Sequence, residues 1–328
     1  MPTQQRMLRV PPLLALAILC TLGPAPARAQ QVRVAVTPTA PTGVAAPPGS
    51  TAADPDISLF RGGALARGVT TEPCTLSGGT TTTCYRITVV GLPVDHAVGP
   101  FCPPTTSSTA ADGGIWFDGD GLYDLDGEFI RGLSSLYGDD NWLLYDEDGN
   151  VNVTATQEAF EGAARPNVAP EYQNHCVEGR VAWLPGGQPV TTTVLIPTSP
   201  VVATFPTSRA RLLSVTLNGV GFNGSAPVRD ILRAYTIAAF DDCGGHFNPV
   251  EGYHVHASMG CSGIEVGGHG RHFAYALDGY AVFTTLAGAS DLDRCGGHNS
   301  DLLGYHYHAA PAAENLMVGC LAGEIARQ

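Results

Sequence analysis

The chain has 328 residues, and all 17 of its basic residues other than histidine are arginine, so lysine is absent. This absence excludes a pyridoxal phosphate or other Schiff-base lysine, and it excludes the phosphate-binding loop, whose lysine contacts nucleotide phosphates. The 30 acidic residues give a formal net charge of -13, which would repel DNA or RNA. The composition therefore argues against pyridoxal phosphate, nucleotide and nucleic-acid partners.

The composition also favours a β-rich fold. The chain contains 40 glycines and 25 prolines, and only 14% of its residues are charged. Such a composition suits many turns between short strands. We expect a mainly β protein, sandwich-like or irregular, that is stapled by disulfides and has few short helices.

Residues 1–29 have the layout of a cleaved secretory signal peptide. Arg6 and Arg9 precede an apolar run over 13–22, and the small-residue site Ala27-Arg28-Ala29 follows it. The run is shorter than the roughly 20 residues that a membrane-spanning helix needs. We expect a secreted or periplasmic protein without a membrane span.

Residues 30–56 are rich in proline, alanine and threonine and carry few large apolar side chains, which predicts a disordered linker. The remaining residues form either one large β domain or two parts. In the second case an N-terminal β-rich region, 57–205, precedes a histidine-rich domain, 206–328.

Several elements can be predicted within this part of the chain. β-Branched runs bounded by glycine and proline predict strands over 85–90, 191–196 and 212–217. Thr154 and Gln157 form a capping-box pattern, which predicts one helix over 157–164 that ends before Pro166.

Eight cysteines follow the signal peptide, and an even number in an exported chain indicates disulfides. Many pairings are open, but spacing and the repeat described below favour four local bridges. These are Cys74–Cys84, Cys243–Cys261 and Cys295–Cys320, which leaves Cys102 with Cys176. The ninth cysteine, Cys20, would be acylated in a lipoprotein, but Leu19 is bulky where that signal needs a small residue.

An internal repeat carries six of the ten histidines. Cys243-Gly-Gly-His246 and Gly252-Tyr-His-Val-His-Ala257 match Cys295-Gly-Gly-His298 and Gly304-Tyr-His-Tyr-His-Ala309, with five residues between the two parts of each copy. Each copy is also preceded by an aspartate, Asp241 or Asp293, and followed by Gly-Cys. A match of this length indicates that both copies have the same local structure.

The His-x-His pairs suggest a metal site, because residues i and i+2 of a strand project to the same face. Neutral imidazole is a good ligand for Zn or Cu. The predicted ligands act either as three per copy or with both copies facing one another, and two further histidines between the copies can complete the shell. The six repeat ligands are His246, His254, His256, His298, His306 and His308, and the two between the copies are His269 and His272. The alternative is a hydrogen-bonded stack of tyrosine and histidine without metal.

With its intact Tyr305-His306-Tyr307-His308 tetrad, the chain resembles the bacterial YHYH family. The first copy reads Tyr253-His254-Val255-His256, and Val255 lies on the strand face away from the histidine pair. The resemblance spans about 212–322 and includes Asn218-Gly219-Val220, residues 234–239 and 275–280, and the closing Gly319-Cys320. It implies export and a metal-binding role for the histidines, and it implies no particular reaction.

A second candidate metal site is a run of acidic residues on a glycine-rich stretch. The run contains Asp118, Asp120, Asp124, Asp126 and Glu128. Carboxylates on such loops suit Ca²⁺, which takes six to eight oxygen ligands. The spacing departs from that of an EF-hand loop, and Asp-Gly pairs are common turn formers. The segment therefore predicts either turns or a calcium site.

Three functions are consistent with these features. The first is an exported protein that binds Cu or Zn through the paired histidine motifs. The second is a metal-dependent extracytoplasmic hydrolase or oxidase, with Asp278 or Asp293 as the base beside an open coordination position. The third is a disulfide-stapled envelope or surface interaction module whose histidines only organise the core. A serine nucleophile is disfavoured because the chain has no Gly-x-Ser-x-Gly elbow.

Overall fold

The computed structural model describes residues 53–207 and 211–327. The expected signal peptide, including Cys20, and most of the expected linker lie outside the described residues. The described residues belong to one compact unit, which is mainly β and consists of short strands in several sheets. None of its helices combines the length and the apolar character that crossing a membrane requires.

The largest sheet has nine strands. They are β8 (Leu212–Thr216), β9 (Gly221–Asn223), β11 (Gly245–Asn248), β12 (Gly252–Val255), β13 (Ile264–Val266), β14 (Gly270–Ala276), β15 (Ala281–Phe283), β16 (Gly297–Ser300) and β17 (Gly304–His308). Their order is β11-β12-β9-β8-β14-β15-β17-β16, and β13 pairs with β14 outside this path.

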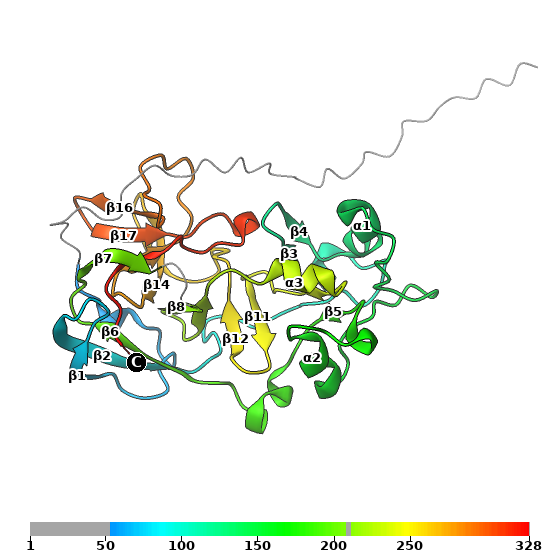
Figure 1. Ribbon diagram of the computed structural model, residues 1–328, viewed down its shortest axis with the longest axis horizontal. Helices are drawn as coiled ribbons and strands as arrows, with labels where there is room; N and C mark the ends of the chain where they lie inside the picture. The colour runs from blue at the N-terminus through cyan, green and yellow to red at the C-terminus, as the bar shows by residue number, and fades with distance from the viewer. Residues whose placement is uncertain (1–52, 208–210, 328) are drawn as a thin grey trace, which may run out of the picture. The chain divides into compact units, whose positions relative to one another are not determined.

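The nine-stranded sheet has two equivalent halves that meet where β8 pairs with β14. In one half β8 and β9 form an antiparallel hairpin, β9 runs parallel to β12, and β12 pairs antiparallel with β11. In the other half β14, β15, β17 and β16 repeat the same pairings in the same order. The duplication therefore extends from the histidine segments to the hairpins that precede them, and the two histidine hairpins form opposite ends of the sheet order (Figure 1).

Four smaller sheets complete the β structure. One has three antiparallel strands, β1 (Thr70–Thr75), β2 (Thr81–Val89) and β6 (Thr192–Pro197). The others are pairs: β3 (Ile115–Phe117) with β4 (Leu122–Asp124), β5 (Cys176–Val177) with β10 (Ile237–Ala238), and β7 (Val202–Thr207) with β18 (Leu321–Gly323). The strands predicted over 85–90, 191–196 and 212–217 are confirmed as β2, β6 and β8.

The described residues include three α-helices, α1 (Gly127–Tyr137), α2 (Gln157–Ala163) and α3 (Val228–Arg233). The single predicted helix is confirmed as α2, but the predicted cap was wrong. Thr156 caps α2, because its hydroxyl accepts a hydrogen bond from the Ala159 N–H at 3.1 Å. The Thr154 hydroxyl instead donates to the Glu178 carbonyl. Short 3₁₀ turns occur at Ile57–Leu59, Ala110–Asp112, Pro170–Tyr172, Val181–Trp183, Pro185–Gly187 and Ala312–Glu314.

Helix α1 occupies part of the acidic stretch, where the sequence predicted no helix. The Asp126 carboxylate accepts a hydrogen bond from the Phe129 N–H at 2.7 Å and so caps the helix. Phe129, Ile130 and Leu133 are buried on one side, and Gly138 ends the helix with a φ of 65°. An Asp-Gly pair can begin a helix as well as a turn, and the apolar side chains that follow it decide which one forms.

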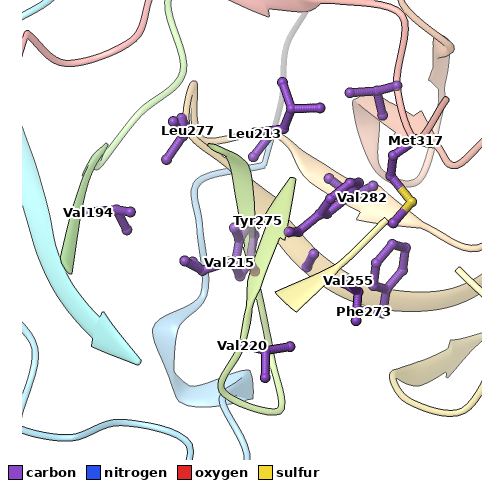
Figure 2. Close-up of a cluster of buried hydrophobic side chains, with 14 of the residues drawn as sticks. Val194, Leu213, Val215, Val220, Val255, Phe273, Tyr275, Leu277, Val282 and Met317 are labelled. Atoms are coloured by element: carbon purple, nitrogen blue, oxygen red, sulfur yellow. The ribbon is translucent and has the colours of Figure 1, made fainter. Parts of the chain in front are cut away.

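The largest hydrophobic core joins both parts of the chain. Val194 from β6, Val215 from β8 and Phe273 from β14 all belong to this core, and Figure 2 labels each of them. This core draws residues from both sides of residue 205. A second core packs Phe117 against Phe240 with ring centroids 4.2 Å apart.

All four expected disulfides are formed: Cys74–Cys84, Cys102–Cys176, Cys243–Cys261 and Cys295–Cys320. Four disulfides indicate an oxidising, extracytoplasmic environment. Two of them lie in the histidine repeat, one in each copy.

Candidate metal centres

The Cys-Gly-Gly-His turn of each copy is held by an aspartate and a tyrosine. In the first copy the Asp241 carboxylate accepts hydrogen bonds from the Cys243 and Gly245 N–H groups, both at 3.1 Å, and from the Tyr253 hydroxyl at 2.7 Å. A Cβ at Gly245 would collide with that hydroxyl, and Gly244 has a φ of 82°. The two glycines are therefore required for the turn that leads into His246.

The second copy repeats these bonds atom for atom. Asp293 accepts hydrogen bonds from the Cys295 N–H at 2.8 Å, the Gly297 N–H at 3.0 Å and the Tyr305 hydroxyl at 2.8 Å. Asp241 and Asp293 thus position the histidine turns. Because Asp293 is committed to these bonds, the structure gives it a positioning role rather than the role of base that the sequence suggested.

The first histidine site consists of His246, His254 and His256. His246 on β11 lies opposite His254 on β12, and His256 follows β12 directly. The Nε2 atom of His254 lies 3.2 Å from Nε2 of His246 and 3.0 Å from Nε2 of His256. One ligand atom from each of the three imidazoles therefore lies within 4.8 Å of the others.

Backbone carbonyls fix the tautomers of two of these histidines. The Nδ1 atom of His254 lies 3.1 Å from the Gly252 carbonyl oxygen, and Nδ1 of His256 is hydrogen-bonded to the Gly224 carbonyl oxygen. A carbonyl can only accept, so the proton is on Nδ1 in each ring. In neutral imidazoles the two Nε2 lone pairs then face each other at 3.0 Å, where they cannot form a hydrogen bond.

The second histidine site consists of His269, His298, His306 and His308. His298 on β16 lies opposite His306 on β17, and their Nε2 atoms are 3.0 Å apart. His269, from the turn between β13 and β14, joins these two in a group whose ligand atoms lie within 4.8 Å of one another. The rings of His298 and His306 each have their centroid 5.1 Å from that of His308.

The same tautomer control operates at the second site. Nδ1 of His306 lies 2.9 Å from the Gly304 carbonyl oxygen, and Nδ1 of His308 lies 2.9 Å from the Thr284 carbonyl oxygen. Nδ1 of His298 lies 2.8 Å from a carboxylate oxygen of Asp291. Nε2 of His308 is buried and has no hydrogen-bond partner in the part of the chain that the structure describes. A buried, unpartnered lone pair on a ring next to two other imidazole rings fits a metal ligand.

Burial keeps most of these imidazoles neutral. It lowers the pKa of His254 to about 4 and the pKa of His256 to about 3. It also lowers the pKa of His306 to about 4 and lowers the pKa of His308. Neutral imidazole is the form that binds metal, so the rings are in the ligating state at neutral pH.

Each site borders a pocket. All three histidines of the first site line a pocket of about 660 Å³. His298 and His308 of the second site line another pocket, of about 1310 Å³. Leu316, Val318 and Gly319 line both pockets, so one segment forms part of the wall of each.

The copies differ on the strand face that points away from the histidines. The buried Tyr307 hydroxyl donates to the Asp278 carboxylate at 2.6 Å and accepts from the Ala322 N–H at 2.6 Å. In the first copy Val255 replaces this tyrosine, and Asn218 stands in the hairpin turn where the second copy has Asp278. The tyrosine and the aspartate therefore occur as a pair. Asp278, fully buried in this network, is not placed as the base that the sequence suggested.

Two sets of predicted ligands lie outside the histidine sites. His272 packs on Phe283, and its Nε2 atom bonds with the Ala274 carbonyl oxygen at 3.0 Å, so it does not complete a metal shell. Among the described residues no three carboxylates of the acidic run converge as a metal-ligating group. Asp118 accepts from the N–H groups of Asp120 and Gly121, and Asp126 caps α1. This part of the acidic run thus supports turns and a helix cap.

One polar group of the first pocket was not expected. Glu251 Oε2 lies 4.0 Å from Nε2 of His254, and its carboxylate also pairs with Arg211 and accepts from the Asn223 amide. Glu251 stands immediately before the Gly-Tyr-His-x-His motif, where the second copy has Leu303. That difference between aligned copies is the signal that could have identified it.

No family model, curated protein or solved structure that we compared with this chain matches it. The chemistry of the two histidine sites is therefore the basis for assigning a function.

Proposed function

We propose that the protein binds two transition-metal ions, Cu or Zn, with one ion at each histidine site. The observation that carries this proposal is the orientation of the rings. Carbonyl oxygens hold the Nδ1 protons of His254, His256, His306 and His308, so the Nε2 lone pairs are directed into the two clusters. This is the arrangement by which proteins usually orient metal-bound histidine.

Lone pairs that face each other at about 3 Å need a cation between or beside them. A proton is a poor candidate at neutral pH, because burial lowers the pKa of His254 to about 4. A divalent metal relieves the repulsion between several lone pairs at once. The net charge of -13 also favours the approach of a cation.

The donor set supports Cu or Zn. Both sites offer imidazole nitrogens, and all eight cysteines of the described residues are in disulfides, so no thiolate is present there. Imidazole suits Zn and Cu, whereas Ca²⁺ and Mg²⁺ prefer oxygen ligands.

We also propose that the chain is an exported member of the YHYH family. The intact Tyr305-His306-Tyr307-His308 tetrad supports the family, and the signal-peptide pattern of residues 1–29 supports a secreted or periplasmic location. The four disulfides agree with such a location.

Metal analysis tests the binding function directly. After loading with Cu²⁺ or Zn²⁺ and desalting, the intact protein is expected to hold two ions per chain. The double variant His254→Ala, His256→Ala is expected to lose one ion, and His306→Ala, His308→Ala the other. His175→Ala is a matched control, because Nδ1 of His175 bonds with the Gln173 carbonyl oxygen outside both sites. Fewer than two ions per chain in the intact protein would contradict the proposal.

Removing the metal is expected to lower the melting temperature. A ligand that binds only the folded state at about 100 times its dissociation constant adds roughly 2.7 kcal/mol of stability. Calorimetry before and after treatment with a chelator measures this difference. An unchanged melting temperature, together with a retained fold in a variant lacking all six repeat histidines, would favour the interaction module without metal.

A metal-dependent enzyme is the second candidate, and one observation favours it. The first site opens on a pocket of about 660 Å³, a size that admits a small substrate. Catalytic zinc sites combine three protein ligands with one open position, and the first site offers three imidazoles.

A further inference from the structure

The two histidine sites differ in the number of imidazoles they offer. At the second site His269 joins His298 and His306 in a group whose ligand atoms lie within 4.8 Å of one another. His308 lies beside this group as a further ring, with its centroid 5.1 Å from those of His298 and His306 and 6.2 Å from that of His269, so four rings surround the site. At the first site the described residues supply three imidazoles. If both sites bind metal, four imidazoles complete a tetrahedral shell at the second site, whereas three leave one position open at the first.

Glu251 is held away from that open position by its other partners. Its Oε1 atom lies 2.6 Å from Nε of Arg211, and its Oε2 atom accepts from the Asn223 amide at 3.1 Å. The remaining separation from Nε2 of His254 is 4.0 Å. A carboxylate with two such partners borders the site without occupying the fourth position.

Access to a pocket does not by itself distinguish the two sites. The second site also borders a pocket, which His298 and His308 line. The first site differs because all three of its imidazoles line its own pocket, so the open side of the cluster faces that space.

Charge determines what the first pocket can hold. Its two carboxylates are paired, Glu251 with Arg211 and Asp230 with Arg233. Arg165 also lines the pocket, is exposed, and has no ion pair or hydrogen bond to the described residues. A bound divalent ion together with Arg165 makes the pocket cationic, which favours an anion.

We propose, building on the metal-binding function above, that the ion at the first site takes a small anionic ligand, a carboxylate or a phosphate, in its open position. The ion at the second site is closed to such ligands by His269. The first site is thus the reactive or ligand-binding centre, and the second is a closed structural centre.

Titration of the Cu²⁺-loaded full chain with azide tests this difference. Azide is a small anion that gives a charge-transfer absorption band when it binds copper, and the metal content of the same sample is measured first. The intact protein is expected to bind two ions and one azide. His254→Ala, His256→Ala should abolish the band, whereas His306→Ala, His308→Ala should keep it.

Removing the His269 imidazole tests whether that ring closes the second site to anions. His269→Ala is expected to keep two ions and to bind two azides, while His175→Ala keeps two ions and one azide. Arg165→Ala should weaken azide binding about fivefold with unchanged metal content, as expected when one partly screened charge is lost. Acetate and inorganic phosphate should each compete with azide at the first site.

The possible failures can be told apart. Fewer than two ions per chain would overturn the proposal of two metal sites and this inference with it. Two ions with no azide bound, or with two azides bound to the intact protein, would overturn the inference alone. Failure of both acetate and phosphate to displace azide would overturn the assigned ligand class.

Discussion

Replacing Tyr307 by phenylalanine is expected to lower the free energy of unfolding by about 3 kcal/mol at neutral pH. The substitution removes the hydroxyl that donates to Asp278 at 2.6 Å and accepts from the Ala322 N–H. Both partners are fully buried, so each would be left without this bond where water cannot replace it. Urea denaturation of the two proteins measures the loss.

The loss should also depend on pH. Burial raises the pKa of Asp278 to about 6, above the value of about 3.9 expected in the unfolded chain. Between about pH 4 and pH 6 the Asp278 carboxyl is therefore protonated in the folded state and ionised in the unfolded state. The stability that this protonation provides is lost as pH rises through about 6. Without the Tyr307 donor the ionised carboxylate is less well satisfied, so the deficit of the variant should be smaller at about pH 5 than at about pH 7.

Tyr145→Phe is the matched control for this substitution. Tyr145 is 41% exposed and lies outside the histidine repeat, so removal of its hydroxyl should change stability little. A Tyr307→Phe protein as stable as the control at neutral pH would contradict the proposed role of the Tyr307–Asp278 pair.

Replacing Cys102 and Cys176 together by serine is expected to cost about 4.5 kcal/mol, the largest effect among the disulfides outside the repeat. The two residues are 74 positions apart, and a cross-link over a long loop removes more entropy from the unfolded chain. The pair Cys74 and Cys84 closes only 10 positions, so the corresponding double serine variant should lose about 3 kcal/mol. Denaturation of both variants and the parent protein gives the comparison.

The Cys102–Cys176 bridge should also matter for the first histidine site. Cys176 lies on β5 opposite Ile237 of β10, and Phe240 soon after β10 packs against His246 with ring centroids 4.7 Å apart. In the serine variant, metal at the first site should be released at a lower urea concentration than metal at the second site. Equal release from both sites would show that the bridge does not support the first site in particular.

Sequence reasoning worked best where the controlling contacts are local. The pair spacing of His254 and His256 determines a shared strand face, and the structure places their Nε2 atoms 3.0 Å apart. Three disulfides close within short stretches of chain, and the fourth followed from the two cysteines that remained. The strands β2, β6 and β8 and the helix α2 were likewise predictable from short patterns.

Sequence reasoning failed where a local pattern permits two structures. Asp126-Gly127 begins helix α1 because Phe129, Ile130 and Leu133 find a core to bury against. Either Thr154 or Thr156 could cap helix α2 from its position in the sequence. In the structure the Thr154 hydroxyl donates to the Glu178 carbonyl oxygen instead, which leaves Thr156 as the cap. In each case a partner distant in the sequence decides between the alternatives.

By itself the sequence indicated that two matching histidine pairs exist, that each pair has the spacing of a shared strand face, and that a disulfide belongs to each copy. The tertiary structure alone decided what those histidines can do. The carbonyl oxygens of Gly224 and Thr284 reach His256 and His308 because β9 and β15 run parallel to the histidine strands, a pairing between distant segments. The same long-range pairing brings His269 to the second site while His272 remains in the core. The spacing of two histidines on one strand is set by local backbone geometry. The tautomer of each ring, the number of ligands at each site and the shape of each pocket depend on which distant segments of the chain meet.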